Sequence, residues 1–499
     1  MIYARKQTAR WTVPYVKGVD RNQTTLFPES IDDYIASDNA VRVIDAYVEQ
    51  LDMVKLNFNY AKAPGVGRPP YNPKALLKLY LYGYLNRTRS SRRLEHETKR
   101  NVEVIWLLEK QQPDFKTIAD FRKNNKKALK EIFKDFNNLC KKWELYGKET
   151  VAIDGSKFKA SNSKKNNYNK KKLERQKKYL DEKIDRYLKE LDENDELEKA
   201  DRKPSAEEIE KRIEELKNRK TRFEDLEKEL ETSGQNEIST SDPDARLMSN
   251  GKGGVEVSYN VQTTVDAKHK LICDFEVTNE PNDSGKLSQM ALRTKEILEV
   301  DKIDALADKG YFDADCLKTC VENEIRPYVS KQKRANGTGN KNYFADRFRY
   351  VPENDHYICP AGVVLARGRA RKDKNGELSG YDYGSAKTCK GCPVREHCTK
   401  SANGRRIHRH KEQDFLDSIA LKSKEDYARY KQRQMIVEHP FGTIKRGWDA
   451  AYFLTRGIES VTTETALTYL AYNLRRAINI LGVEELVQRL QESGKPVLV

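Results

Sequence analysis

The chain has 499 residues and a formal net charge of +16, and 34% of its residues are charged. No apolar run approaches the ~18 residues of a membrane span, and the first residues, MIYARKQTAR, lack the apolar stretch of a signal peptide, so we expect a cytoplasmic protein. The excess of Lys and Arg favours a polyanionic partner, although ribosome-associated and membrane-surface proteins share this balance.

The N-terminal region has the apolar periodicity of helices. NAVRVIDAYVEQL and NPKALLKLYLYGYL place apolar residues three and four apart, on the two sides of a Pro-rich linker. The next segment, RTRSSRRLEHETKRNVEVIWLLEK, is basic at its front and apolar at its back. Arg87, Arg89, Arg92 and Arg93 are therefore candidate contacts to the DNA backbone, and a solvated helix face explains them equally well.

A strand and a helical insertion follow. KETVAIDGSKF predicts a strand that ends at Asp154-Gly155, followed by a polar, basic loop. In the segment 170–232, apolar residues recur at three and four spacing in two runs. This pattern predicts an antiparallel coiled-coil hairpin inserted into the domain, serving as a spacer, clamp or interaction arm.

Strand signals then return. SYNVQTTVDAKHKLICDFEVT predicts two strands around a turn at 266–270, SGKLSQMALRTKEILEV an amphipathic helix, and KIDALADKGYF a short apolar strand ending at Asp308. This order predicts a mixed α/β sheet with acidic residues near strand ends. Glycines, basic residues and cysteines at 333–415 predict a second insertion, and the chain reads helical again from Lys424.

Two aspartates share one local pattern, because Asp154 and Asp308 each follow an apolar strand and precede a small-residue turn with a Lys. If neighbouring strands bring them together, their charges repel each other, and a divalent cation removes that difficulty. Mg²⁺ prefers such oxygen ligands together with substrate phosphates. Glu438 is the candidate for a third carboxylate, with Lys445 seven residues later on the same helical face.

Pro440, directly after Glu438-His439, predicts that this helix bends or restarts just past the glutamate. Other acids compete for the second aspartate position. We interpret Asp266 as a hairpin turn, Asp313 as a helix cap, and Asp283 as a cap of the helix that follows it.

Four cysteines lie in the second insertion, where CPAG is followed by CKGCPVREHC. A Cys-x2-Cys pair with two outlying cysteines suits a tetrahedral thiolate site. The candidate ligands of a structural Zn²⁺ are Cys359, Cys389, Cys392 and Cys398. His397 competes with Cys398, and reduced, unliganded cysteines or a redox pair are the alternatives. The other four cysteines read as packing residues.

Asp154 in VAIDGSKFKA, Asp308 in ALADKGYFDAD and Glu438 in VEHPFGTIKRGW resemble the DDE triad of bacterial insertion-sequence transposases. The resemblance extends to the helical N-terminal region, YNVQTTVDAKHKLI, the four-cysteine insertion and LAYNLRR. It implies a ribonuclease H-like catalytic core, two Mg²⁺ or Mn²⁺ ions held by the triad, and a nucleoid-associated protein. It also implies cutting and joining at terminal inverted repeats, action on target DNA, and a homodimer on DNA.

The implied division is a helical DNA-binding domain at 1–148, a catalytic domain at 149–480 containing the insertions 170–232 and 333–415, and a C-terminal tail at 481–499. Lys445 would contact DNA beside the cleaved bond, with Lys157 as a further DNA contact. Related transposases carry Tyr-x2-Arg-x3-Glu-x6-Lys, but here Tyr430 and Arg433 each lie one residue early, a rotation of roughly 100° on a helix.

Two other functions remain open from the sequence. One is a catalytically inactive DNA-binding or regulatory protein that uses the basic helices and the cysteines. The other is a structure-specific nuclease with the same core that cuts DNA without strand transfer. The glycine patterns GVGRPP and NGKGGV lack the context of a nucleotide site, so we expect no nucleotide cofactor.

Overall fold

The computed structural model describes residues 30–62, 69–196, 206–249, 253–331, 336–373 and 375–493. The start of the predicted N-terminal domain, the connection within the predicted hairpin and the end of the predicted tail lie outside the described residues.

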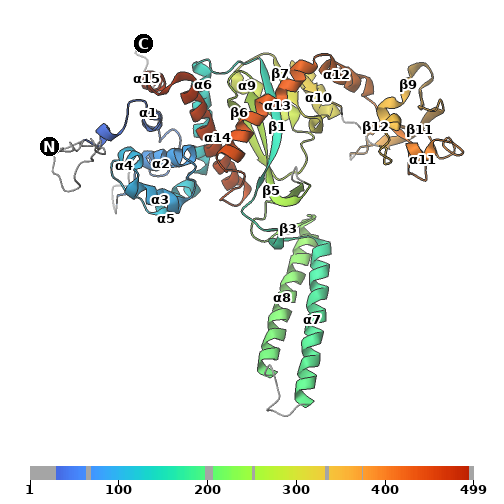
Figure 1. Cartoon of the computed structure of the whole chain (residues 1–499), viewed down its shortest axis with the longest axis horizontal. Coiled ribbons are helices and arrows are strands. Elements are labelled where there is room, and N and C mark those ends of the chain that lie inside the picture. The colour runs from blue at the N-terminus through green and yellow to red at the C-terminus, as the bar shows by residue number, and fades with distance from the viewer. Residues whose placement is uncertain are drawn as a thin grey trace, which may run out of the picture.

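The N-terminal region is helical, as predicted (Figure 1). Asn72 caps the second helix, and Pro73 occupies its first turn, where a missing N–H costs nothing. The basic-then-apolar segment splits into two helices at Asn101, whose side chain accepts hydrogen bonds from the first N–H groups of the second one. The helices are α1 Val41–Gln50, α2 Pro73–Leu85, α3 Ser91–Arg100, α4 Val102–Leu107, α5 Phe115–Asn124 and α6 Lys126–Lys142.

The centre of the molecule is a six-stranded mixed sheet. Strand β5 pairs with β1 along one edge and with both β4 and β6 along the other, and the order continues from β1 to β7 and β8. Pairing is antiparallel among β4, β5, β6 and β1, and parallel from β1 to β7 and β8. The strands are β1 Thr150–Lys159, β4 Arg246–Ser249, β5 Val255–Asp266, β6 Ile272–Thr278, β7 Ile303–Ala307 and β8 Ile325–Val329.

Helices cover both faces of this sheet. Thr263 of β5 contacts Tyr469 of α14, whereas its neighbour Gln262 contacts Tyr311 beyond β7. Because successive strand residues point to opposite faces, α14 lies on one face and the 311 region on the other. The helices are α9 Leu287–Leu298, α10 Ala314–Glu322, α12 Gln413–Glu425, α13 Tyr427–Phe441 and α14 Ile458–Leu481.

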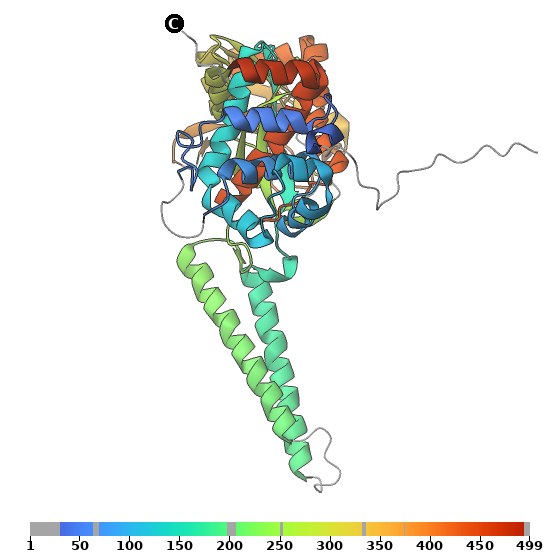
Figure 2. The same ribbon diagram turned by 90° about the vertical axis from the view of Figure 1, so that its left-hand side faces the viewer.

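Two long helices, α7 Lys170–Glu196 and α8 Ala206–Ser233, project from the sheet as a hairpin (Figures 1 and 2). Their apolar residues form two small clusters between the helices, separate from the main core. A short pair of strands, β2 Asn167–Tyr168 and β3 Ile238–Ser239, closes the base. The predicted helical hairpin is therefore present; its description as a coiled coil stays a prediction.

The Cys-rich segment forms a second sheet of five antiparallel strands in the order β13-β12-β11-β10-β9. It has an aromatic core of its own around Phe348, Tyr357 and Tyr383. The elements are β9 Arg349–Val351, β10 His356–Ile358, β11 Val364–Lys372, β12 Leu378–Tyr383, helix α11 Arg395–Cys398 and β13 Ile407–His410.

One buried apolar cluster runs from the N-terminal helices through the central sheet to the last helix. Phe133 of α6 packs edge-on against Phe275 of β6, so the core is continuous across the predicted boundary at 148/149. Helix α15 Val483–Ser493 buries Leu486 and Leu490 and packs on α1. Much of the predicted tail is therefore a packed helix. Within the described ranges, no helix has the length and apolarity needed to cross a membrane.

Candidate active site and cysteine cluster

The strand register places Asp154 beside Asp308. Strands β1 and β7 are parallel, and their last paired residues are Ile153 and Ala307. Each aspartate is the next residue, at the point where the two strands separate. The prediction that β1 ends at Asp154-Gly155 is wrong, because β1 continues to Lys159 while paired with β5. Asp308 does end its strand, and its side chain caps the 3-10 turn Lys309–Tyr311.

Asp154 lies in a buried environment in which neighbouring carboxylates oppose its ionisation. The pKa of Asp154 is raised to about 7, chiefly by burial and in addition by the negative charges of Asp283 and Asp308, with Arg433 opposing the shift. Without a cation, Asp154 therefore holds a proton for much of the time near neutral pH. Carboxylate oxygens held this close suit a hard divalent cation, which would replace that proton.

Glu438 lies on α13, which crosses β1, β5 and β7. Its side chain is exposed, whereas its neighbours Ile436 and Val437 are buried. In the described parts of the chain, no group of three or more His, Cys, Asp or Glu side chains is arranged to hold a metal ion. The structure thus pairs the two aspartates, and the complete triad stays a prediction.

Arg433 reaches the site despite its one-residue offset from the expected pattern. Its positive charge acts on Asp154, and its guanidinium lies 5.6 Å from the ring centroid of Tyr430 on the preceding turn. Tyr430 itself packs against the core. Below them, Arg429 pairs with the fully buried Asp304 of β7 and donates to Thr150 Oγ1 at 3.0 Å, which fixes α13 against the sheet.

The helix does not restart just past Glu438, because α13 continues to Phe441; a bend at this point stays a prediction. Pro440 lies within the last turn of α13, and the chain then widens into a π-helical turn, Gly442–Gly447. Lys445 in this turn donates to the backbone oxygen of Lys157 at 2.6 Å, with its ammonium 4.2 Å from the Phe158 ring centroid. Burial lowers the pKa of Lys445 to about 8, and Asp154 opposes that shift. Lys445 therefore lies close enough to Asp154 for their charges to interact.

The other predicted DNA contacts differ in exposure. Lys157 faces Asp283, with 3.4 Å between its ammonium and Asp283 Oδ1. Arg92 and Arg93 are exposed on α3, and Arg92 stacks on Phe115. Arg89, from the same basic run, is buried and pairs with Glu464, so it is not available to DNA.

The three other aspartates considered for the second triad position have different roles in the structure. Asp266 closes the β5–β6 turn by accepting hydrogen bonds from the backbone of Gly147, Lys148 and Lys268. Asp313 caps α10 through the Cys316 N–H. Both interpretations are confirmed. The predicted cap role of Asp283 is wrong, because α9 has Lys286 at its N-cap and Asp283 instead turns toward β1 and β5. Sequence periodicity carries no signal for that contact.

The four predicted cysteine ligands line one small cavity in the Cys-rich segment. The backbone N–H groups of Val363 and Arg405 each donate to a cysteine sulfur, Cys359 Sγ and Cys389 Sγ, at 3.3 Å. Burial raises the pKa of Cys398, the other three cysteines raise it further, and Arg405 opposes the shift. His397 is exposed and does not line this cavity, which favours Cys398 as the fourth candidate ligand.

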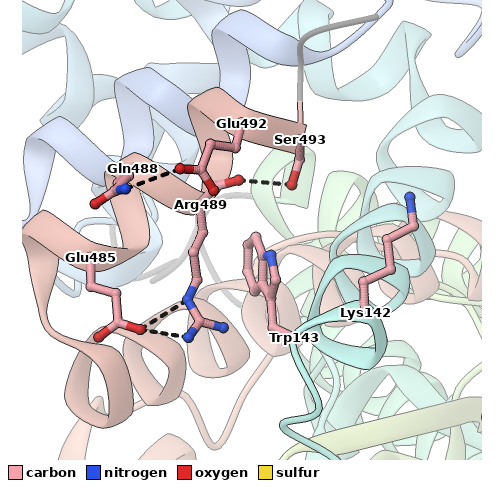
Figure 3. A pocket seen from close by; sticks show the side chains of 7 residues that line it. All are labelled: Lys142, Trp143, Glu485, Gln488, Arg489, Glu492 and Ser493. Atoms are coloured by element: carbon pink, nitrogen blue, oxygen red, sulfur yellow. Dashed lines mark hydrogen bonds and ion pairs between the residues drawn. The ribbon is translucent and has the colours of Figure 1, made fainter. Parts of the chain in front are cut away.

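A larger hollow of about 680 Å³ lies between α6 and α15 (Figure 3). Its lining includes Trp143 and the Arg489–Glu485 ion pair of α15. Such an exposed pair, four residues apart on one helix, contributes little stability. None of the predicted site residues lines this hollow, so we assign it no role in the chemistry.

Two segments of the chain match known protein families. A family described as a transposase domain (DUF772) matches residues 29–124, and one described as a transposase DDE domain matches residues 358–478. The second match contains the four cysteines and Glu438, whereas Asp154 and Asp308 precede it. No curated protein and no solved structure matches the chain.

The paired aspartates lie between two segments that are each similar to a transposase family. The two matches support an insertion-sequence transposase of the DDE type.

Proposed function

We propose that this transposase cuts and joins phosphodiester bonds at the ends of its insertion sequence, with Asp154, Asp308 and Glu438 as the metal-binding triad. The juxtaposition of Asp154 and Asp308 by the β1–β7 register is the observation that carries the proposal. The sheet order β6-β5-β1-β7-β8, with parallel pairing only beyond β1, supports a ribonuclease H-like core. The division into a DNA-binding domain, a catalytic domain and two insertions belongs to the same proposal.

The donor set suits Mg²⁺ or Mn²⁺, since such ions are commonly held by one or two carboxylates together with substrate phosphates. Asp154 and Asp308 would hold the ions, and Glu438 would join when DNA is bound. Two such ions supply activation of the attacking oxygen and stabilisation of the leaving oxygen in an in-line displacement.

Cationic side chains beside the aspartates would position the DNA. Lys445 and Arg433 place positive charge next to Asp154, where a scissile phosphate would lie. Lys157 shares this edge of the sheet, and exposed Arg92 and Arg93 offer contacts to more distant phosphates. Terminal inverted repeats, a target DNA and a homodimer on DNA are the partners that we carry over from the resemblance, in the cytoplasm and at the nucleoid.

The test is an assay with a labelled duplex that ends in the element's own terminus, plus an unlabelled target. We expect nicking that depends on Mg²⁺ or Mn²⁺, and joined products in which labelled ends are linked to target DNA. Nicking without joined products would instead identify a structure-specific nuclease. Binding without nicking at any divalent-ion concentration would identify an inactive DNA-binding or regulatory protein.

We also propose that the four cysteines hold a structural Zn²⁺. Four thiolates around one cavity repel one another, and N–H donors to two of the sulfurs suit thiolate ligands. The purified protein is expected to contain about one zinc per chain. Cys392→Ser should lose it, because three ligands remain, whereas Cys316→Ser on α10 should keep it. Metal analysis of the two variants decides the matter, and equal zinc contents would contradict the proposal.

A further inference from the structure

A polar network lies behind Asp154 on the opposite face of the central sheet. In the antiparallel register of β1 and β5, Gly155 lies opposite Gln262, and Lys157 lies opposite Asn260. Opposed and alternate residues share a face, so these four residues point away from the face to which Asp154 points. The network therefore lies behind the strand that carries Asp154.

Asp283, in the loop between β6 and α9, joins the members of this network. Its Oδ1 accepts hydrogen bonds from Asn260 Nδ2 at 2.8 Å and Gln262 Nε2 at 2.7 Å, and from Lys157 Nζ at 3.4 Å. Gln262 Oε1 in turn accepts from the buried hydroxyl of Tyr311. One chain of hydrogen bonds thus connects the turn after Asp308 with the strand that carries Asp154.

The glycine after Asp154 leaves the space in which the network packs against β1. A Cβ atom at Gly155 would collide with Asp283 Oδ1 and with Gln262 Nε2, and it would lie 3.0 Å from Asn260 Oδ1. The three polar side chains therefore occupy the space that any other residue at 155 would fill. Gly155 therefore does more than permit a turn after Asp154. Because it has no side chain, the carboxylate of Asp283 can pack directly against the backbone of β1.

We propose that Asp283 is a positioning residue of the active site: its carboxylate ties β1 at Gly155 to the 309–311 turn through Gln262 and so fixes the separation of Asp154 and Asp308. The inference rests on the proposed function above. Asp283 Oδ1 accepts hydrogen bonds from three side chains of β1 and β5, so an anchoring role predicts that these bonds, and not the negative charge of Asp283, are what matters. The amide oxygen of an Asp283→Asn variant can accept the same hydrogen bonds without the negative charge. This variant therefore distinguishes an anchoring role from a cation-binding role.

The experiment measures single-turnover cleavage of a pre-bound end duplex, together with its dissociation constant. Asp283→Ala should lower the cleavage rate about 10²-fold, the effect of misplacing reacting groups by about an ångström, with end binding unchanged. Asp283→Asn should stay within about tenfold of the wild type, because its oxygen preserves the anchor. Asn282→Ala, at an exposed neighbour, should match the wild type. An Asn variant as slow as the Ala variant, or an Ala variant as fast as the wild type, would overturn the proposal.

Coupling to Gly155 gives a second test. Gly155→Ala already displaces the network, so adding Asp283→Ala should slow cleavage little further, whereas multiplied effects would overturn the proposal. Wild-type protein that fails to cleave would count against the proposed function alone. Crystal structures then decide the inference: Asp154 and Asp308 should separate in Asp283→Ala, and unchanged positions would overturn it.

Discussion

Asp154→Asn is expected to lower the rate of end cleavage by at least about 10³-fold, a loss of about 4 kcal/mol of transition-state stabilisation. The substitution keeps the shape of the side chain and removes the charge that would hold a divalent cation. DNA-end binding should persist, since the exposed basic residues are unchanged. Cleavage and mobility-shift assays on the same end duplex provide the two measurements.

Asp313→Asn is the matched control, because Asp313 lies shortly after Asp308 and its side chain caps α10 and accepts from Ser284 Oγ, and Asn caps a helix about as well as Asp. It should cleave at the wild-type rate. Wild-type cleavage by Asp154→Asn would remove this residue from the catalytic site. Glu438→Gln adds information, because a loss as large as that of Asp154→Asn would mean that metal or DNA draws the exposed Glu438 toward the aspartates.

Glu464→Ala is expected to lower the free energy of unfolding by about 3–5 kcal/mol, the cost of breaking a buried ion pair from one side. Glu464 of α14 is fully buried and pairs with Arg89 at 3.3 Å. It also accepts hydrogen bonds from the backbone N–H groups of Leu454 and Thr455. Truncation removes the carboxylate that pairs with the buried Arg89 and that accepts from the two backbone N–H groups. The denaturant midpoint of the purified variant measures the loss.

Glu459→Ala on the same helix is the control, because its pair with Lys126 is largely exposed and should contribute at most about 1 kcal/mol. If the two variants unfold at the same midpoint, the Arg89–Glu464 pair does not hold the N-terminal helices to α14. Arg89 also donates to the backbone oxygens of Tyr452 and Asp449. The destabilisation in Glu464→Ala should therefore extend to the loop that follows Lys445.

The two long helices and the apolar strands were predictable, because the sequence patterns that specify them are local. The strands around Asp154 and Asp308 and the β5–β6 hairpin follow from apolar alternation and turn residues, which act within a few positions. Pro440 predicted a disturbance of the helix just past Glu438, because a proline removes a helical hydrogen bond wherever it lies, but the π-helical turn lies further on, at Gly442–Gly447. The antiparallel sheet in the Cys-rich segment was not predicted, since its short strands carry little periodicity.

The amino-acid sequence by itself determined that this protein is basic, that it is built from helices around a mixed sheet, and that Asp154 and Asp308 each come directly after a run of apolar residues. Only the tertiary structure decided that these aspartates are neighbours, that Arg89 is internal, that the charge of Arg433 acts on Asp154, and that Asp283 packs against Gly155. Each of these depends on contacts between segments far apart in the chain, with strand register and burial setting the distance. Local periodicity, which fixes only the face on which a residue lies, does not encode such distances.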